Sequence, residues 1–286
     1  MFVQTERNGF QHIPINEPQD MLRALPAGAY GSTINGRGEV FFHPSAVATE
    51  LLVDLDTPTA RYVQREIADF FNPDITARLQ QARLKHRRGV ILHGKPGTGK
   101  TSLVRALFNE IIRHDAVILL EADMGHLARK YIPAIRLSDP DRPIVVVYDE
   151  FHRIVDSQRT SLLQLLDGLT SPDHIMLIGT TNYMARFPAT LCERPSRFSL
   201  VLEVPALPIE ARYVYVTSKF DMLSSDTVKK LIELTADKAL DFLEEACKLF
   251  LMGLSVQEIT DRFTATDIKN TQVFDEFDDE YTEEEE

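Results

Sequence analysis

Residues 94–101 read Gly-Lys-Pro-Gly-Thr-Gly-Lys-Thr, the G-x-x-x-x-G-K-[ST] spacing of a phosphate-binding loop. An apolar run at 89–93 precedes the loop, and a helix-forming run at 102–112 follows it. Glycines allow a concave turn whose backbone N–H groups point at phosphate oxygens. Lys100 would reach the outer phosphates, and Thr101 would offer its hydroxyl to Mg²⁺ at the positive N-terminus of the helix. The pattern therefore predicts a phosphate-bearing ligand that is bound together with magnesium.

A second chemical feature is the apolar run 144–148, which ends in two acids, Asp149 and Glu150. A continuous apolar run is typical of a central parallel strand buried on both faces. Open α/β sheets bind their ligands at the carboxyl ends of such strands. We expect Asp149 to join the magnesium shell and Glu150 to orient or polarise an attacking water. An Asp-Glu pair alone is weak evidence, but downstream of a phosphate loop it becomes strong.

The loop and the acidic strand together define the expected nucleotide pocket, with ATP and Mg²⁺ as the expected cofactors. Thr101 and Asp149 are the expected magnesium ligands. The residues expected to surround the nucleotide are Gly94, Lys95, Pro96, Gly97, Thr98, Gly99, Lys100, Thr101, Ser102 and Asp149.

Further polar residues follow two later apolar runs. The run at 175–179 leads into Thr-Thr-Asn, and Asn182 could hydrogen-bond the attacking water or the terminal phosphate, although such a triplet is more often a turn cap. Arg194 and Arg197 flank a proline turn just before the run at 199–204. A lone arginine pair usually forms surface salt bridges. Phosphoryl transfer, however, needs cations at the terminal phosphate, and an arginine finger from a neighbouring subunit is a common source.

The elements that must position these residues alternate between apolar strands and helical runs. This alternation favours a parallel sheet with helices on both faces. After Pro208 the strand pattern stops and helical patterns continue. The predicted strands are 89–93, 116–121, 144–149, 175–179 and 199–204, and the predicted later helices are 209–221, 224–236, 238–252 and 255–264.

Four segments follow from these patterns. Residues 1–57 contain a predicted β-hairpin around Asn-Gly-Arg-Gly at 35–38, as either a separate module or an extension of the core sheet. Residues 58–207 form the α/β domain, and 208–265 form a small all-helical lid domain. Residues 266–286 are a charged tail that we expect to be disordered.

Composition excludes several classes of protein. Nine of the 43 acidic residues lie in 274–286, which contain no base, so most of the net charge of −12 belongs to this tail. Nothing predicts a broad basic surface for nucleic acid. The two cysteines, Cys192 and Cys247, provide no disulfide framework or metal spacing. No apolar stretch is long enough to cross a bilayer, so we expect a soluble cytoplasmic protein without membrane contact.

Taken together, the loop, the acidic strand, Asn182 and the two arginines resemble the AAA family of ATPases within the AAA+ superfamily. The resemblance covers residues from about 58 to 264. It implies a five-stranded parallel sheet followed by a helical lid, and a ring, usually a hexamer, in which both arginines reach the nucleotide of the adjacent subunit. The residues before the loop, Arg87-Arg-Gly, are similar to a branch that includes certain mitochondrial ATPases, although the membrane segment of those proteins is missing here.

The same resemblance suggests a substrate-gripping pore loop. Residues 126–132 are similar to the family segment in which an aromatic–aliphatic pair contacts an extended polypeptide, and Tyr131 and Ile132 match that pair. A ring of aromatic side chains would grip polypeptide without sequence preference. The family usually continues with glycine, whereas this chain has Pro133. Packing at the start of a helix is the alternative interpretation of this pair.

We therefore expect a ring-forming, Mg²⁺-dependent ATPase that remodels or unfolds a protein. Lys100 and Mg²⁺ would neutralise charge, Glu150 would prepare the water, Asn182 would sense the phosphate, and Arg194 and Arg197 would complete the neighbouring site. The alternative is a nucleic-acid-linked ATPase, such as a helicase loader. The acidic tail, with its interspersed aromatic residues, could dock a basic partner.

Overall fold

The computed structural model describes residues 2–4, 9–12, 21–22, 24–46, 56–167, 172–192, 194, 196–236 and 238–265. The chain falls into two compact units, Met1–Pro205 and Ala206–Glu286.

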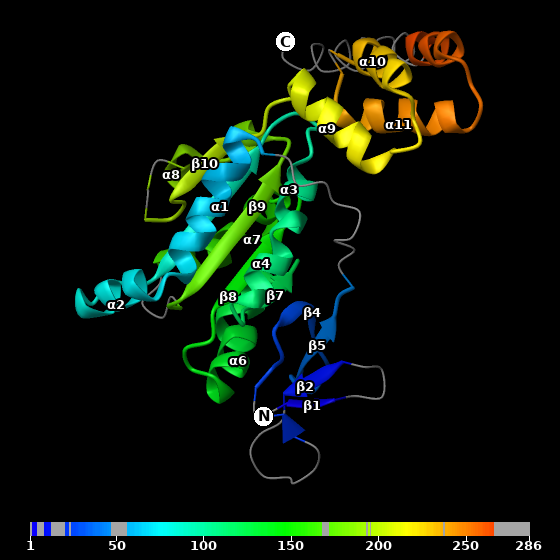
Figure 1. Ribbon diagram of the computed structural model, residues 1–286. Coiled ribbons are helices and arrows are strands. Elements are labelled where there is room, and N and C mark those ends of the chain that lie inside the picture. Colours follow the sequence, from blue (N-terminus) through cyan, green and yellow to red (C-terminus); the bar gives the residue numbers. More distant parts are fainter. Residues whose placement is uncertain are drawn as a thin grey trace, which may run out of the picture. The chain divides into compact units, whose positions relative to one another are not determined.

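A single mostly parallel sheet forms the centre of the first unit (Figure 1). All five predicted core strands are present, adjacent and parallel. They confirm the predicted α/β fold class. The acidic strand, predicted at 144–149, lies between the strands predicted at 175–179 and 116–121. In spatial order they are β10 (Leu200–Glu203), β6 (Arg87–His93), β9 (Ile175–Thr181), β8 (Ile144–Tyr148) and β7 (Val117–Leu120).

Within the described residues the sheet has ten strands in place of the expected five, because the N-terminal residues extend it. The predicted hairpin is present as β4 (Gly28–Ile34) and β5 (Val40–Pro44), and its turn is held by Asn35, whose Oδ1 accepts hydrogen bonds from the N–H groups of residues 37 and 39. β4 then pairs in parallel with β7. The outer antiparallel strands are β2 (Phe10–His12), β1 (Phe2–Gln4) and β3 (Met21–Leu22). The hairpin thus belongs to the core sheet, and the domain limit at residue 57 stays a prediction.

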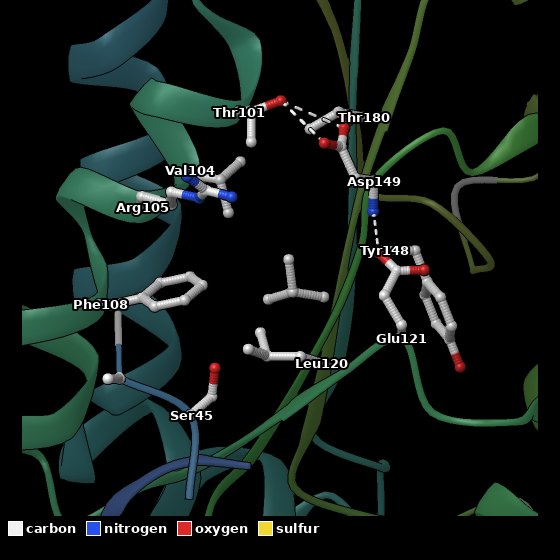
Figure 2. Close-up of a pocket in the computed structure, with 12 residues that line it drawn as sticks. Ser45, Thr101, Val104, Arg105, Phe108, Leu120, Glu121, Tyr148, Asp149 and Thr180 are labelled. Carbon is white, nitrogen blue, oxygen red and sulfur yellow. Dashed lines mark hydrogen bonds between the residues drawn. The ribbon is translucent and has the colours of Figure 1, made fainter. Parts of the chain in front are cut away.

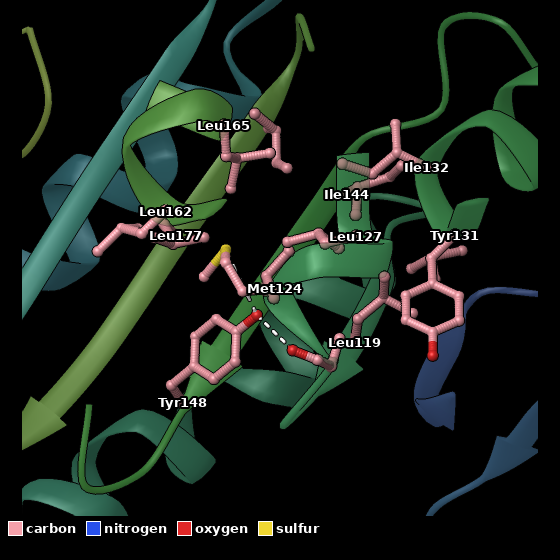
Figure 3. Packing of buried hydrophobic residues seen from close by; sticks show 14 of the residues in the cluster. Leu119, Met124, Leu127, Tyr131, Ile132, Ile144, Tyr148, Leu162, Leu165 and Leu177 are labelled. Atoms are coloured by element: carbon pink, nitrogen blue, oxygen red, sulfur yellow. Dashed lines mark hydrogen bonds between the residues drawn. The ribbon is translucent and has the colours of Figure 1, made fainter. Parts of the chain in front are cut away.

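Helices cover both faces of this sheet. Along β8, Val145 and Val147 pack into one buried cluster, and Ile144 and Val146 pack into a second. Figure 3 shows part of the second cluster. This double burial explains why the strand reads as a continuous apolar run. The first cluster includes residues of α1 (Pro58–Phe71), α3 (Lys100–Ala106) and α4 (Phe108–Arg113). The second includes residues of α5 (Met124–His126), the π-helix η1 (Leu127–Tyr131), α6 (Ile132–Ser138), α7 (His152–Asp167) and α8 (Ala189–Cys192).

Two short elements complete the first unit. α2 (Pro73–Gln81) follows α1 after a break at Asn72, whose Oδ1 accepts a hydrogen bond from Asp74 N–H at 2.9 Å. The 3-10 helix η2 (Met184–Arg186) follows β9. The break at Asn72 arises because the next residue is Pro73, which disfavours helical backbone at the residue before it and suits the first position of a new helix.

The second unit is helical, as the sequence predicted. It contains α9 (Ile209–Lys219), α10 (Ser225–Leu234) and α11 (Leu240–Leu251), and residues 256–265 are also helical. Arg212 is fully buried, and its guanidinium donates hydrogen bonds to three backbone carbonyls, those of Leu207, Thr235 and Lys238. A buried cation is tolerated when its donors are satisfied in this way. This side chain therefore ties α9 to the turn between α10 and α11.

We expect Glu244 to contribute measurably to the stability of this unit. Its carboxylate accepts hydrogen bonds from Tyr215 Oη at 2.7 Å and contacts Lys219 Nζ and Lys248 Nζ, each at 3.1 Å. Burial alone would raise the pKa of Glu244, but these hydrogen bonds outweigh it and lower the pKa from 4.5 to about 2. Glu244→Gln should therefore lower the free energy of unfolding by about 2 kcal/mol at pH 7.

The sign of the pH dependence follows from the lowered pKa. The contribution of Glu244 is complete above pH 4.5 and is lost as the pH falls towards 2, so the difference between the two proteins should shrink over that window. Urea unfolding at several pH values measures it. Glu245→Gln on the same helix, at an exposed position, is the matched control. If both variants lower the free energy of unfolding equally, or if the effect of Glu244→Gln does not change with pH, the stabilising role assigned to the Glu244 carboxylate is wrong.

Candidate functional site

The phosphate loop connects the end of β6 to the start of α3. Gly94, Gly97 and Gly99 have φ values of +152°, +72° and +89°, which residues with side chains rarely adopt. A Cβ atom on Gly94 would also lie 2.5 Å from the carbonyl oxygen of Val204, at the end of the neighbouring edge strand. The glycine spacing is therefore a requirement of both backbone conformation and packing. The loop leads into α3 with Gly99 at the N-cap position.

Lys100 is the first residue of α3 and is only 6 % exposed. Its Nζ donates hydrogen bonds to the carbonyl oxygens of Gly94, at 2.9 Å, and Lys95, at 2.7 Å. The ammonium group is thus held by the backbone of the loop itself. This position inside the concave turn is the one from which a lysine neutralises phosphate charge.

Thr101 and Asp149 come together from α3 and the end of β8, as Figure 2 shows. The Thr101 hydroxyl lies 3.1 Å from both carboxylate oxygens of Asp149. A hydroxyl and a carboxylate are the oxygen ligands that Mg²⁺ takes beside nucleotide phosphates, which supply further oxygens. The side chains present therefore fit a magnesium ion bound with a nucleotide. Within the described residues no group of three His, Cys, Asp or Glu side chains could hold a metal ion without such help.

Two residues beside Asp149 were missed by sequence reasoning. The Thr180 hydroxyl donates a hydrogen bond to Asp149 Oδ1, and Glu121, which directly follows β7, accepts the Asp149 N–H with its own carboxylate. Partial burial is the main reason that the pKa of Glu121 is raised, and the Asp149 carboxylate acts in the same direction. The available signal was positional, since both residues stand at the carboxyl ends of strands that flank β8.

A cavity of about 280 Å³ lies beside these polar groups (Figure 2). Thr101, Asp149 and Thr180 line its polar end, and Arg105 and Glu121 also face it. Its remaining wall is largely apolar. The other lining residues are Ser45, Ala46, Val104, Phe108, Leu120, Val147 and Tyr148.

Glu150 occupies a strained turn immediately after Asp149. Its φ is +50°, an uncommon conformation for a residue with a side chain. The carboxylate oxygen Oε1 accepts a hydrogen bond from Asn182 Nδ2 at 2.8 Å, so the two residues that the sequence placed at one sheet edge do meet. On the other side, Oε2 lies 3.5 Å from Nδ1 of His152, which sequence reasoning did not consider. The carboxylate is therefore held from two sides.

The two candidate arginines differ sharply in environment. Arg194 has a side chain that is 62 % exposed, with Nη1 3.9 Å from Asp167 Oδ2. Arg197 is only 7 % exposed, and it forms hydrogen bonds to the Asp167 carboxylate and to the Thr190 carbonyl. The hydrogen bond from Arg197 lowers the pKa of Asp167. Arg197 is thus bound by a carboxylate of its own chain, whereas Arg194 is largely exposed, and the role of both arginines towards a neighbouring subunit stays a prediction.

Tyr131 and Ile132 do not form an exposed pair. They are 2 % and 4 % exposed and belong to the buried cluster of Figure 3. Tyr131 packs edge-on against Phe42 and His126. Phe42 comes from the N-terminal hairpin, which had no role in the sequence-based interpretation. Side chains packed inside the core cannot grip a polypeptide, so this arrangement supports the alternative of helix-start packing.

The comparisons with known proteins agree with this geometry. Residues 90–206 match the family described as ATPase family associated with various cellular activities (AAA). The match contains the phosphate loop, the acidic strand and both candidate arginines, so this segment is similar to the AAA family.

Several curated relatives share this region. The chain is 32 % identical over 155 residues to the ATPase family gene 2 protein of Saccharomyces cerevisiae, covering 49 % of this chain and 20 % of that protein. It is 33 % identical over 143 residues to the proteasome-activating nucleotidase of Methanosphaerula palustris, covering 44 % and 34 %. It is 25 % identical over 240 residues to the cell division cycle protein 48 homolog of Archaeoglobus fulgidus, covering 71 % and 33 %. The chain therefore spans about a third or less of the length of these relatives.

Two further expectations from the sequence concern membrane-spanning helices and the acidic tail. Across the described ranges, no helix has the length and apolar character needed to cross a lipid bilayer. The acidic tail at 266–286 lies outside the described residues.

Proposed function

We propose that this protein is a Mg²⁺-dependent ATPase that assembles into a ring, most simply a hexamer, and uses hydrolysis to remodel or unfold a protein. The convergence of Lys100, Thr101, Asp149 and Glu150 at one sheet edge carries the ATPase part of the proposal. In-line attack of water on the terminal phosphate needs charge neutralisation and an oriented nucleophile, and these side chains supply both.

The protein-directed part of the proposal rests on the relatives. One of them is a proteasome-activating nucleotidase, to which the 143 aligned residues are 33 % identical. The nearly neutral body of the chain also favours a protein substrate over nucleic acid. Because Tyr131 is buried, its side chain takes no part in the proposed contact with substrate.

A direct test uses the Glu150→Gln protein, held in ATP and recovered from its native cell. We expect a specific protein to bind in the presence of ATP and to be released in the presence of ADP. ATP-dependent unfolding of that purified client by the wild-type chain would complete the demonstration. Bound nucleic acid that salt releases would instead favour the alternative function.

One observation favours that alternative of a nucleic-acid-linked ATPase. A groove of about 430 Å³ between the hairpin turn and the π-helix is lined by three cations, Arg37, Arg129 and Lys130, and one acid, Glu39. None of the three cations forms an ion pair within the described residues. Stimulation of ATP hydrolysis by DNA, lost at higher salt and in Lys130→Glu, would favour this second function.

The ring proposal makes a prediction that separates the two arginines. Arg194→Ala should leave the fold and nucleotide binding intact but reduce turnover about a thousandfold or more, as loss of an arginine finger does. Arg197→Ala should instead lower the free energy of unfolding by about 2 kcal/mol, because it removes the charged hydrogen bonds to Asp167. Melting temperature and phosphate release measure the two effects.

Mixing provides the control for action between subunits. Rings that combine Arg194→Ala with Glu150→Gln subunits should regain part of the activity, since intact sites form at some interfaces. No recovery at any mixing ratio would count against completion of the site by a neighbour.

A further inference from the structure

His152 has an environment that none of the roles assigned above explains. It is the first residue of α7, two residues beyond Glu150, and its side chain is 4 % exposed. The edge of the ring packs against Tyr183, with centroids 4.8 Å apart. Its Nδ1 lies 3.2 Å from the Thr181 hydroxyl and 3.5 Å from Glu150 Oε2. A buried imidazole therefore joins the end of β9 to the carboxylate that we propose as the base.

The neighbours of Nδ1 indicate which ring nitrogen carries the proton. The Thr181 hydroxyl already accepts the backbone N–H of Tyr183 at 3.0 Å and retains one further lone pair. The second neighbour is a carboxylate oxygen, which only accepts hydrogen bonds when it is ionised. An unprotonated Nδ1 would direct its lone pair towards that oxygen and repel it, whereas an Nδ1–H group is attracted by both oxygens. The geometry thus favours the state with the proton on Nδ1.

The backbone around Glu150 is fixed, so the contact with His152 affects only the orientation of the Glu150 carboxylate. Glu150 has a left-handed φ of +50°, and the next N–H, of Phe151, donates to the Thr180 carbonyl at 2.7 Å. The backbone of the turn is therefore fixed to β9, while the carboxylate can still rotate about its side-chain bonds. Asn182 holds one carboxylate oxygen and His152 faces the other. Two contacts from different elements fix the plane of a carboxylate, which a single contact does not.

We propose that His152 is a positioning residue for Glu150, holding the carboxylate in the orientation from which it prepares the attacking water. The inference rests on the proposed ATPase function. In this role His152 acts through its contacts with Glu150 and Thr181. Its loss should therefore lower kcat and leave the apparent KM for ATP nearly unchanged, since misplacing a catalytic group affects the chemical step.

A matched pair of amide variants tests this role. His152→Asn keeps an N–H donor at the position of Nδ1, because both nitrogens are bonded to Cγ. His152→Gln places its amide one bond further out, near the position of Nε2. We expect His152→Ala and His152→Gln to lower kcat about ten- to a hundredfold, with the KM for ATP changed by no more than about threefold. His152→Asn should restore kcat to within about threefold of wild type. Equal activity of the Asn and Gln variants, or a normal kcat in His152→Ala, would overturn the proposal.

Two further measurements separate positioning from folding and from the ATPase proposal. Melting temperatures identify a variant that fails only because it is unstable. The Asn and Gln variants then compare two carboxamides that differ by one methylene group. Nitrogen-15 NMR of labelled histidines, with His152 assigned from the His152→Asn spectrum, reports the protonated ring nitrogen directly. A protonated Nδ1 is expected, and an unprotonated Nδ1 overturns the inference even in a protein without turnover. Wild-type protein that releases no phosphate from ATP would overturn the proposed function and leave the NMR result to decide the contact.

Discussion

Glu150→Gln should reduce the rate of ATP hydrolysis about 10²- to 10⁴-fold, the range attributable to loss of a general base. The amide has nearly the same shape as the carboxylate and can keep a hydrogen bond to Asn182 Nδ2 through its oxygen, so the fold should be unaffected. It cannot, however, accept a proton from water near neutral pH. Phosphate release in a single turnover measures the effect on the chemical step without the later release of products.

Nucleotide binding should survive this substitution. Lys100, Thr101 and Asp149, which we propose to hold the phosphates and magnesium, do not contact the Glu150 side chain through any hydrogen bond of the described residues. The Kd for ATP should therefore stay within about threefold of the wild-type value, a change of less than about 1 kcal/mol. Normal hydrolysis by Glu150→Gln would show that the base has been assigned to the wrong residue.

The second large effect concerns Lys100. Lys100→Ala removes an ammonium that sits inside the phosphate loop, 6 % exposed and held by the loop carbonyls. Hydrogen bonds to charged groups contribute about 1.5–3 kcal/mol each, so loss of the contacts to phosphate should weaken ATP binding about a hundredfold or more. Titration with a fluorescent ATP analogue in the presence of Mg²⁺ measures the change.

Lys95 offers the matched control within the same loop. Its position is exposed, and it is the carbonyl oxygen of Lys95 that accepts the hydrogen bond from Lys100. Lys95→Ala removes the same charge from the loop but leaves that carbonyl in place. It should alter the Kd for ATP by no more than about threefold. If both variants lose affinity equally, the general positive charge of the loop accounts for binding and the specific position of Lys100 does not.

The sequence by itself determined the conformation of the phosphate loop and the position of the acidic strand. Both depend on local rules: glycines where φ is positive, a lysine at the start of a helix, and acids where a strand ends. The apolar runs also predicted all five core strands and the later helices. Such signals lie within a few residues of one another, so spacing along the chain suffices to read them.

The tertiary structure decided the features that depend on distant partners. Arg197 and Arg194 look equivalent in sequence, but Asp167, thirty positions before Arg197, binds the first of them inside the subunit. Tyr131 matches an exposed family position, yet Phe42 from the added hairpin helps to bury it. Thr181 reaches His152 because β9 pairs with β8, the strand that leads into Glu150. Burial and pairing of this kind follow from strand order and packing, and the spacing of residues along the chain does not encode them.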